Sequence, residues 1–202
     1  MINPTITIDQ LMSWKPCYSR AQVEEIANGR TEMSVMDILR LDIPIRDKLW
    51  VVLREDVLGA RLLCLVSCLF AEHVLPMYEK AYPDDNRPRQ AIEVARRYAD
   101  GNATDDELDA VRTVAHGAIM AFANIDAREA AWYAAQAAWA TAFMGAREVA
   151  WYAAWAICHA AQHTIPDVTW AAVNAAWAAE RQWQVETLIK LLEEGDKNSN
   201  GN

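Results

Sequence analysis

The feature that most constrains the fold is a segment of very small and very large side chains between Ala121 and Ala179. Alanine fills 24 of its 59 positions, and only six of them carry a charge. Alanine is the strongest helix former, and glycine and proline are scarce here, so the composition favours helix and argues against a sheet. Helices with so little charge must cover one another or a partner. We therefore predict an all-α protein, a multi-helix bundle of antiparallel helical hairpins with an Ala/Trp-rich core.

An internal repeat supports the hairpin prediction. The sequence Ala-Arg-Glu-Ala-Ala-Trp-Tyr-Ala-Ala at Ala127–Ala135 recurs at Ala146–Ala154 with valine in place of one alanine. Each copy predicts one helix of an antiparallel pair. Alanine faces let helix axes approach toward the short end of the usual ~8–10 Å range, and tryptophan fills the wider gaps.

Seven tryptophans lie between Trp132 and Trp183. The seven-residue spacing of Trp132 and Trp139, repeated by Trp170 and Trp177, places both rings of each pair on one stripe of a helix. This helical spacing favours a role in the core. Two alternatives stay open, namely a groove that stacks an aromatic ligand and an apolar surface at a dimer or partner interface, where tryptophan and tyrosine are enriched.

Capping signals and breakers divide the rest of the chain into helices. Residues 1–58 predict a small helical N-terminal section, residues 59–195 the Ala/Trp-rich bundle, and residues 196–202 a disordered tail; one continuous domain over 5–195 is the alternative. The predicted boundaries, in chain order, are a turn at Asp9–Trp14, capping boxes at Ser19–Gln22 and Ser34–Asp37, a helix at Ile43–Arg54, a buried helix from Leu58 bent near Pro76, a helix Pro88–Ala99 capped by Asp85 or Asn86, a capping box at Thr104–Glu107, boundaries at Asp126, Gly145 and Thr164–Asp167, and a last helix from about Val168 to Glu194 ended by Gly195.

Charge and cysteine usage limit the compartment and the partners. The net charge of −9 and a pI near 4.9 argue against phosphate-driven nucleic-acid binding and favour a protein partner with a basic surface. Cys64 and Cys68 share one side of an apolar helix, which is typical of core cysteines. No signal peptide is visible at the N-terminus, so we expect a cytoplasmic protein. The charge-free runs from Ala130 to Ala146 and from Val149 to Pro166 are not rich in leucine, isoleucine and valine as a membrane span is. We therefore expect no transmembrane segment and no membrane partner.

Two charged groups are candidate binding sites. An acidic patch could attract a cationic protein surface, although acids also favour helix N-termini for purely structural reasons. An arginine group with nearby aromatic rings could bind a nucleotide-like ligand, because guanidinium groups bind oxyanions bidentately, although such arginines more often balance neighbouring acids. The patch consists of Asp100, Asp105, Asp106, Glu107 and Asp109, and the ligand candidates are Arg87, Arg89, Arg96, Arg97, Trp132, Trp139, Trp151 and Trp155.

One histidine pair has the spacing of a metal site. His159 and His163 are four residues apart and would share one face of a helix, with Cys158 or His116 as conceivable further ligands. The alternative is a partly buried histidine pair near a helix C-terminus. No phosphate-binding glycine loop, nucleophile elbow, kinase motif or CxxC occurs, so we predict a non-enzymatic protein without a cofactor.

One stretch carries a family resemblance. The chain resembles an alanine- and tryptophan-rich helical family of bacterial and phage genomes whose members are labelled immunity proteins. The resemblance implies an all-helical fold and a role in toxin immunity or in conflict with host defence, and it supplies no catalytic residues. It covers the central half to two-thirds of the chain, and its pattern is carried by Arg89, Ala91, Glu93, Ala95, Arg97, Tyr98, Asp100, Gly101, Ala103, Thr104, Glu107 and Leu108, followed by the Ala/Trp repeats.

Three hypotheses follow for the function. The favoured one is an immunity-like or phage counter-defence inhibitor that occludes a protein partner and self-associates through its alanine-rich hairpins. The second is a sponge for a nucleotide-like signal, with tryptophan stacking and arginine holding phosphate. The third is a metal-dependent enzyme that uses His159 and His163.

Overall fold

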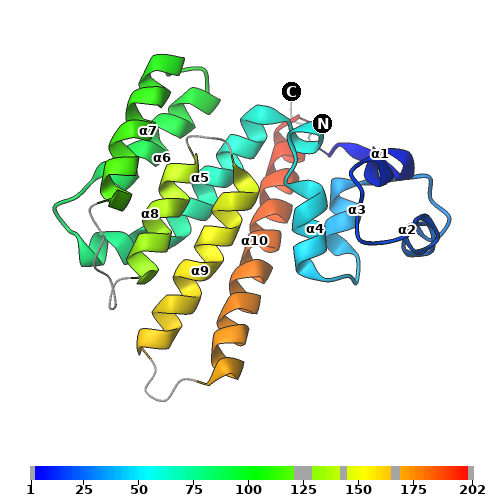
Figure 1. The fold of residues 1–202 in the computed structure, drawn as a ribbon. Coiled ribbons are helices and arrows are strands. Elements are labelled where there is room, and N and C mark those ends of the chain that lie inside the picture. Colours follow the sequence, from blue (N-terminus) through cyan, green and yellow to red (C-terminus); the bar gives the residue numbers. More distant parts are fainter. Residues whose placement is uncertain (1–2, 121–128, 142–144, 165–168, 200–202) are drawn as a thin grey trace. The chain divides into compact units, whose positions relative to one another are not determined.

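The computed structural model describes residues 3–120, 129–141, 145–164 and 169–199, and it confirms the all-α class (Figure 1). Within these ranges the chain forms ten helices and one two-stranded sheet. It divides into two compact units, which we call unit 1 (Met1–Leu58 with Val185–Asn202) and unit 2 (Gly59–Gln184). Two long helices, α5 and α10, contribute residues to both units.

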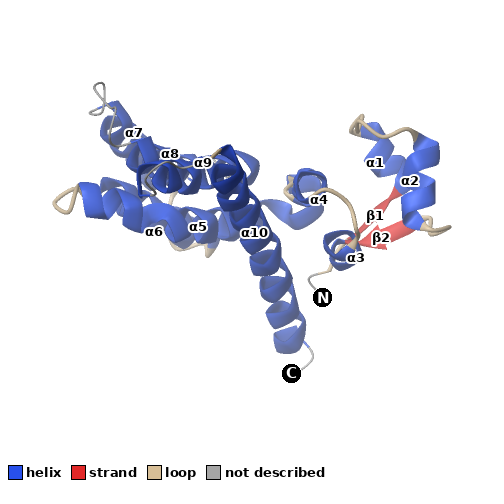
Figure 2. Ribbon diagram, turned by 90° about the horizontal axis from the view of Figure 1, so that it is seen from below, coloured by secondary structure: helices blue, strands red, loops and turns tan. Residues whose placement is uncertain are grey.

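Unit 1 contains the short elements and a sheet that the sequence analysis did not predict. Its two strands, β1 and β2, are red in Figure 2. They pair antiparallel with Ile6 opposite Met33, and both of these side chains are buried. The predicted capping boxes at Ser19–Gln22 and Ser34–Asp37 are both formed. The elements are β1 (Thr5–Thr7), α1 (Ile8–Ser13), α2 (Arg20–Ala27), β2 (Glu32–Ser34), α3 (Val35–Arg40) and α4 (Ile45–Val52).

Unit 2 is the helical bundle. Helix α6 packs against α7 and α8, and α8 packs against α9 as the predicted hairpin. The capping box at Thr104–Glu107 is formed, since each residue accepts a hydrogen bond from the backbone amide of the other. The helices are α5 (Glu55–Ala81), α6 (Arg87–Ala99), α7 (Asp105–Met120), α8 (Glu129–Thr141), α9 (Ala146–Thr164) and α10 (Trp170–Ser199).

Helix α5 is the predicted central helix, with one difference in its geometry. The residue of α5 that leaves helical dihedral angles is Gly59, with φ 73° and ψ 154°, so the helix breaks there, while Pro76 lies inside the helix. By length and composition α5 is apolar enough to cross a membrane, and 56% of its most apolar stretch is buried inside the protein. The core helix of a soluble protein meets the same test.

Alanine makes the contact between α8 and α9, as the sequence predicts. Ala134 and Ala138 of α8 and Ala150 and Ala153 of α9 have no exposed surface. With only methyl groups between them, the two backbones can approach closely. These alanine faces are therefore covered within unit 2 itself.

Two further details differ from the sequence-based boundaries, and a third decides between two predicted alternatives. Helix α10 continues to Ser199, beyond the predicted end at Gly195. Helix α4 spans Ile45–Val52 with Pro44 as its N-cap, so it is shorter than the predicted helix Ile43–Arg54. At the start of α6 the N-cap position is Asn86, whose side chain makes no capping hydrogen bond; of the two predicted capping residues it is Asp85 that makes the contact, since its Oδ1 accepts from the Arg87 amide at 3.1 Å.

Candidate functional site

The most distinctive surface of unit 2 is an array of aromatic rings across α8, α9 and the first half of α10. These helices lie side by side with α9 in the middle (Figure 1). Tyr133 of α8 stacks on Trp155 and His159 of α9, with ring centroids 5.7 and 5.0 Å apart. Trp155 meets Trp177 of α10 edge-on at 5.4 Å. We call this array the aromatic cluster; its members are Tyr133, Trp151, Tyr152, Trp155, His159 and Trp177.

The position of these rings corrects the interpretation of tryptophan as core. Every tryptophan whose side chain the structure describes is half-buried or exposed, because alanine occupies the contact between the helices and leaves the large rings at its flanks. Trp151 is 44% exposed and lines a shallow depression with Tyr152, Arg147 and Glu148. The cluster therefore presents an aromatic edge bordered by charges.

The inner part of the cluster contains polar atoms without ideal partners. His159 Nδ1 lies 2.5 Å from Glu129 Oε2, at ion-pair distance but without the in-line geometry of a hydrogen bond. Among the described residues, Trp155 Nε1 is buried and has no hydrogen-bond partner. Burial raises the pKa of the Tyr133 hydroxyl above its ordinary value. Buried polar atoms without a hydrogen-bond partner, as at Trp155 Nε1 and His159 Nδ1, are uncommon in native interiors.

A buried polar network continues from the cluster along α10. The Arg181 guanidinium lies 5.0 Å from the Trp177 ring and 3.3 Å from Gln184 Oε1. The Gln184 amide donates to Glu180 Oε1 and to the Ala150 carbonyl, both at 2.9 Å. Burial lowers the pKa of Arg181 below its ordinary value. The network thus joins α10 to α9 beneath the cluster.

His73 of α5 forms the other end of the network through its contact with Glu180. Its Nε2 lies 3.1 Å from Oε2 of the buried Glu180, and its ring stacks on Trp183 at 3.7 Å. The sequence analysis missed these residues, because His73 and Glu180 are far apart in the chain. The available signal was the adjacent pair Glu180 and Arg181, which directly follows the charge-poor segment.

The acids of the predicted patch lie at the end of α6 and the start of α7, where most of them have partners within unit 2. Asp100 pairs with Arg61 at 2.8 Å, and Asp105 accepts from the Tyr98 hydroxyl at 2.8 Å. Glu107 caps α7 and pairs with Arg97, and these contacts hold the pKa of Glu107 below its ordinary value. Asp109 pairs with Arg112. In the described part of the chain, Asp106 is the acid of the patch without a hydrogen bond or ion pair.

The four candidate arginines are likewise paired, each with a carboxylate of unit 2. Arg87 binds Asp85 through two side-chain nitrogens, at 2.8 and 2.5 Å. The partners of Arg89, Arg96 and Arg97 are Glu79, Glu72 and Glu107. The ring centroid of Trp139 lies 5.9 Å from that of His116, and Trp155 belongs to the aromatic cluster. The side chain of Trp132 lies outside the described residues.

The predicted metal pair is only partly described. His159 belongs to the aromatic cluster, and the side chain of His163 lies outside the described residues. Burial raises the pKa of the Cys158 thiol to about 11, and that thiol donates to the Val173 carbonyl. Where side chains are described, no three histidine, cysteine or acidic groups come together as metal ligands would.

Fold and site together define a helical protein whose most distinctive surface is suited to contacts with another macromolecule. The chain belongs to the family described as Imm-5 like putative immunity protein, whose family model matches residues 60–191. A search of curated proteins and a search of solved structures returned no match. The matched segment contains the aromatic cluster and the buried polar network, and it begins where unit 2 begins.

Proposed function

We propose that the chain is a non-enzymatic immunity protein that neutralises a protein partner in the cytoplasm by covering its working surface. Family membership supports an immunity-like role. The net charge of −9 favours a partner with a basic surface, because complementary charge accelerates encounter. The proposed partner is a toxin of a competing cell or a component of host defence against phage.

The observation that carries the proposal is the exposure of Trp151. It is 44% exposed at the rim of a packed array of rings, with Arg147 and Glu148 beside it. Tryptophan, tyrosine and arginine dominate the binding energy of protein interfaces, and they act best when their neighbours already hold them in place. Contacts to Tyr133, Tyr152 and Trp155 hold Trp151 in this way.

The test begins with growth rescue. The chain is co-expressed with a panel of bacterial toxin domains and of defence proteins whose activation arrests growth, and a rescued pair is purified for measurement of its Kd. Trp151→Ala should weaken that complex about 30-fold, the equivalent of about 2 kcal/mol for a central interface tryptophan. Association of the wild type should slow as salt is raised, because screening weakens attraction between exposed charges.

Trp170 provides the matched control. It is 77% exposed, and within the described part of the chain it makes no ring contact with the aromatic cluster. Trp170→Ala should leave the Kd close to that of the wild type. Rescue without a physical complex, or equal affinities for wild type and Trp151→Ala, would refute the proposal.

A further inference from the structure

Unit 1 contains a cavity of about 360 Å³ outside the segment that the family model matches. It opens partly to solvent and is lined by residues of α1, α2, β2, α3 and α4, of the turn before α2 and of the turn before α4. Most of its walls are apolar side chains, among them Val23, Met33 and Ile38, which are almost fully buried. Every residue of the wall belongs to unit 1, so the cavity is a property of that unit alone.

An apolar cavity of this size is suited to binding a small molecule. Native interiors are close-packed and contain few voids larger than a water molecule. At roughly 30 Å³ for each water, the volume corresponds to about a dozen waters, but apolar walls offer them few hydrogen bonds. Small-molecule sites are typically concave, mostly apolar and of this size, with a few polar groups that fix orientation.

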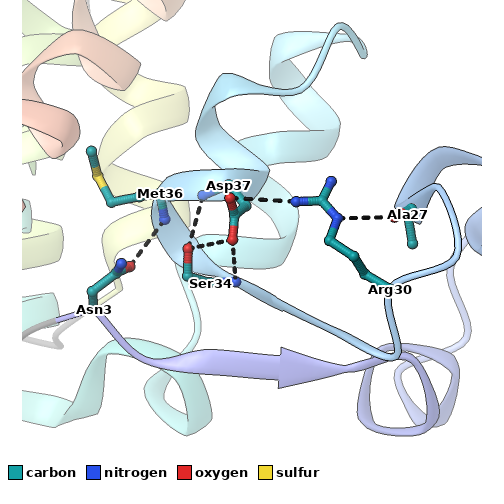
Figure 3. A network of polar contacts seen from close by, with 6 residues as sticks. All are labelled: Asn3, Ala27, Arg30, Ser34, Met36 and Asp37. Carbon is teal, nitrogen blue, oxygen red and sulfur yellow. Dashed lines mark hydrogen bonds and ion pairs between the residues drawn. The ribbon is translucent and has the colours of Figure 1, made fainter.

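A polar network outside the cavity lining ties together elements that form its walls, namely the end of α2, β2 and the start of α3. The Asp37 carboxylate accepts from the Ser34 hydroxyl and amide at 2.6 and 3.0 Å, and these hydrogen bonds hold the pKa of Asp37 below its ordinary value (Figure 3). Arg30 bridges Asp37 and the Ala27 carbonyl at the end of α2. Asn3 accepts from the Met36 amide at 3.1 Å and so joins the N-terminal strand region to α3.

The wall formed by Trp50 is also fixed. The Arg54 guanidinium lies 4.1 Å from the Trp50 ring and 4.5 Å from the Trp14 ring. Next to Trp14, Lys15 adopts a left-handed backbone conformation with φ 54°, which is uncommon for a residue with a side chain. Lys15 follows the C-cap of α1, where a left-handed residue commonly ends a helix, and its amide donates to the Met12 carbonyl at 3.1 Å.

The charged groups of the cavity lining are two cations and one carboxylate, those of Lys15, Arg46 and Asp47. Lys15 and Arg46 are exposed, and within the described residues Lys15 makes no ion pair. The carboxylate, that of Asp47, is engaged by the Tyr18 hydroxyl at 2.7 Å and by Arg46 at 3.4 Å. The charged part of the lining therefore favours a negative group on the ligand.

We propose that unit 1 binds a small amphiphile with a hydrocarbon body and one carboxylate. The body fills the apolar cavity, and at about a dozen non-hydrogen atoms a medium-chain acyl carboxylate matches the volume. The carboxylate lies at Lys15 and Arg46. This site is independent of the aromatic cluster and of the proposed immunity function.

Cys17 gives the test a direct readout. It lines the cavity and is exposed, whereas Cys64, Cys68 and Cys158 are buried. In the full-length protein, decanoate below its micellar concentration should slow alkylation of Cys17, followed by intact mass, about tenfold when its concentration is ten times its Kd. Decanol should protect less well, and decyltrimethylammonium least. No protection by any of the three, or equal protection by all of them, would overturn the proposal, as would protection of Cys17 only by a protein partner.

Two pairs of variants separate the body from the head group. Val23→Phe fills the cavity and should abolish protection by decanoate, whereas Val114→Phe on the exposed face of α7 should not. Ile43→Phe at the half-buried part of the wall repeats the test if Val23→Phe fails to fold. Lys15→Gln should remove the preference for decanoate over decanol, and Lys80→Gln should preserve it. Full protection in a folded Val23→Phe or Ile43→Phe protein would show that the ligand binds elsewhere.

Discussion

At the scale of single residues, Asp85 illustrates how one side chain organises a loop. It accepts from the Arg87 amide and guanidinium and, at 2.5 Å, from the hydroxyl of the buried Tyr78. These contacts, those of Arg87 foremost, lower the pKa of Asp85 to about 2. Burial, together with Asp85, raises the pKa of Tyr78 above its ordinary value.

This arrangement predicts a pH dependence of stability. In the unfolded chain Asp85 takes up a proton as the pH falls below about 4, whereas in the folded chain it stays ionised to about pH 2. The ionised form therefore contributes on the order of 2 kcal/mol above pH 4, and this contribution is lost as the pH falls from about 4 to 2. Asp85→Asn should lower the free energy of urea unfolding at pH 7 and flatten its decline in that window.

Asp84 is the matched control for this measurement. It is an exposed neighbour in the same loop, so Asp84→Asn should leave both the free energy and its pH profile near those of the wild type. Identical pH profiles for the wild type and Asp85→Asn would contradict the assigned role of Asp85.

At the scale of the element, local signals were predictable and non-local pairing was not. The capping boxes at Ser19–Gln22 and Thr104–Glu107 need only residues three apart, so the sequence is sufficient to find them. The sheet joins Thr5–Thr7 to Glu32–Ser34 across two helices. Its signal was the alternation of exposed Thr5, buried Ile6 and exposed Thr7, which is too short to identify a strand without its partner.

The aromatic cluster shows a second limit of sequence analysis. Spacing on a helix identifies which rings share a stripe, but it does not tell whether alanine or tryptophan occupies the contact between helices. Ala153 and Ala154 occupy it in α9, so Trp151 and Trp155 lie at its flanks. The contact between His73 and Glu180 likewise depends on how α5 and α10 pack within unit 2.

The close contact of α8 and α9 predicts that side chains larger than alanine are not tolerated between them. Ala153 has no exposed surface, so Ala153→Leu forces the helices apart or distorts rotamers, at a cost of about 1–3 kcal/mol. Urea unfolding should register this loss. Ala178→Leu on the exposed side of α10 should cost less than about 0.5 kcal/mol, as surface changes generally do. Equal stabilities for the two variants would show that the alanine face tolerates larger side chains.

At the scale of the whole molecule, net charge should govern solution behaviour. The charge is −9 at pH 7, and it vanishes near the pI of about 4.9. Proteins close to zero net charge lose their mutual repulsion and associate. Light scattering should therefore rise as the pH is lowered from 7 to 5, and it should fall again when the pH is restored.

Circular dichroism distinguishes this association from unfolding. At pH 5 the Asp85 carboxylate is still ionised in both folded and unfolded chains, so its contribution to stability remains. The helical signal should therefore persist while scattering rises. A monodisperse protein at pH 5 would contradict this prediction.

The path of α10 has a consequence for how the protein is made. Its first half, to Gln184, belongs to unit 2, whereas Leu188 and Leu192 are buried in unit 1 and Glu193 pairs there with Arg40 at 3.0 Å. The first 58 residues thus emerge from the ribosome long before the helix that completes their core. During translation their apolar surface stays exposed until α10 is synthesised, and we expect a chaperone to bind them in that interval.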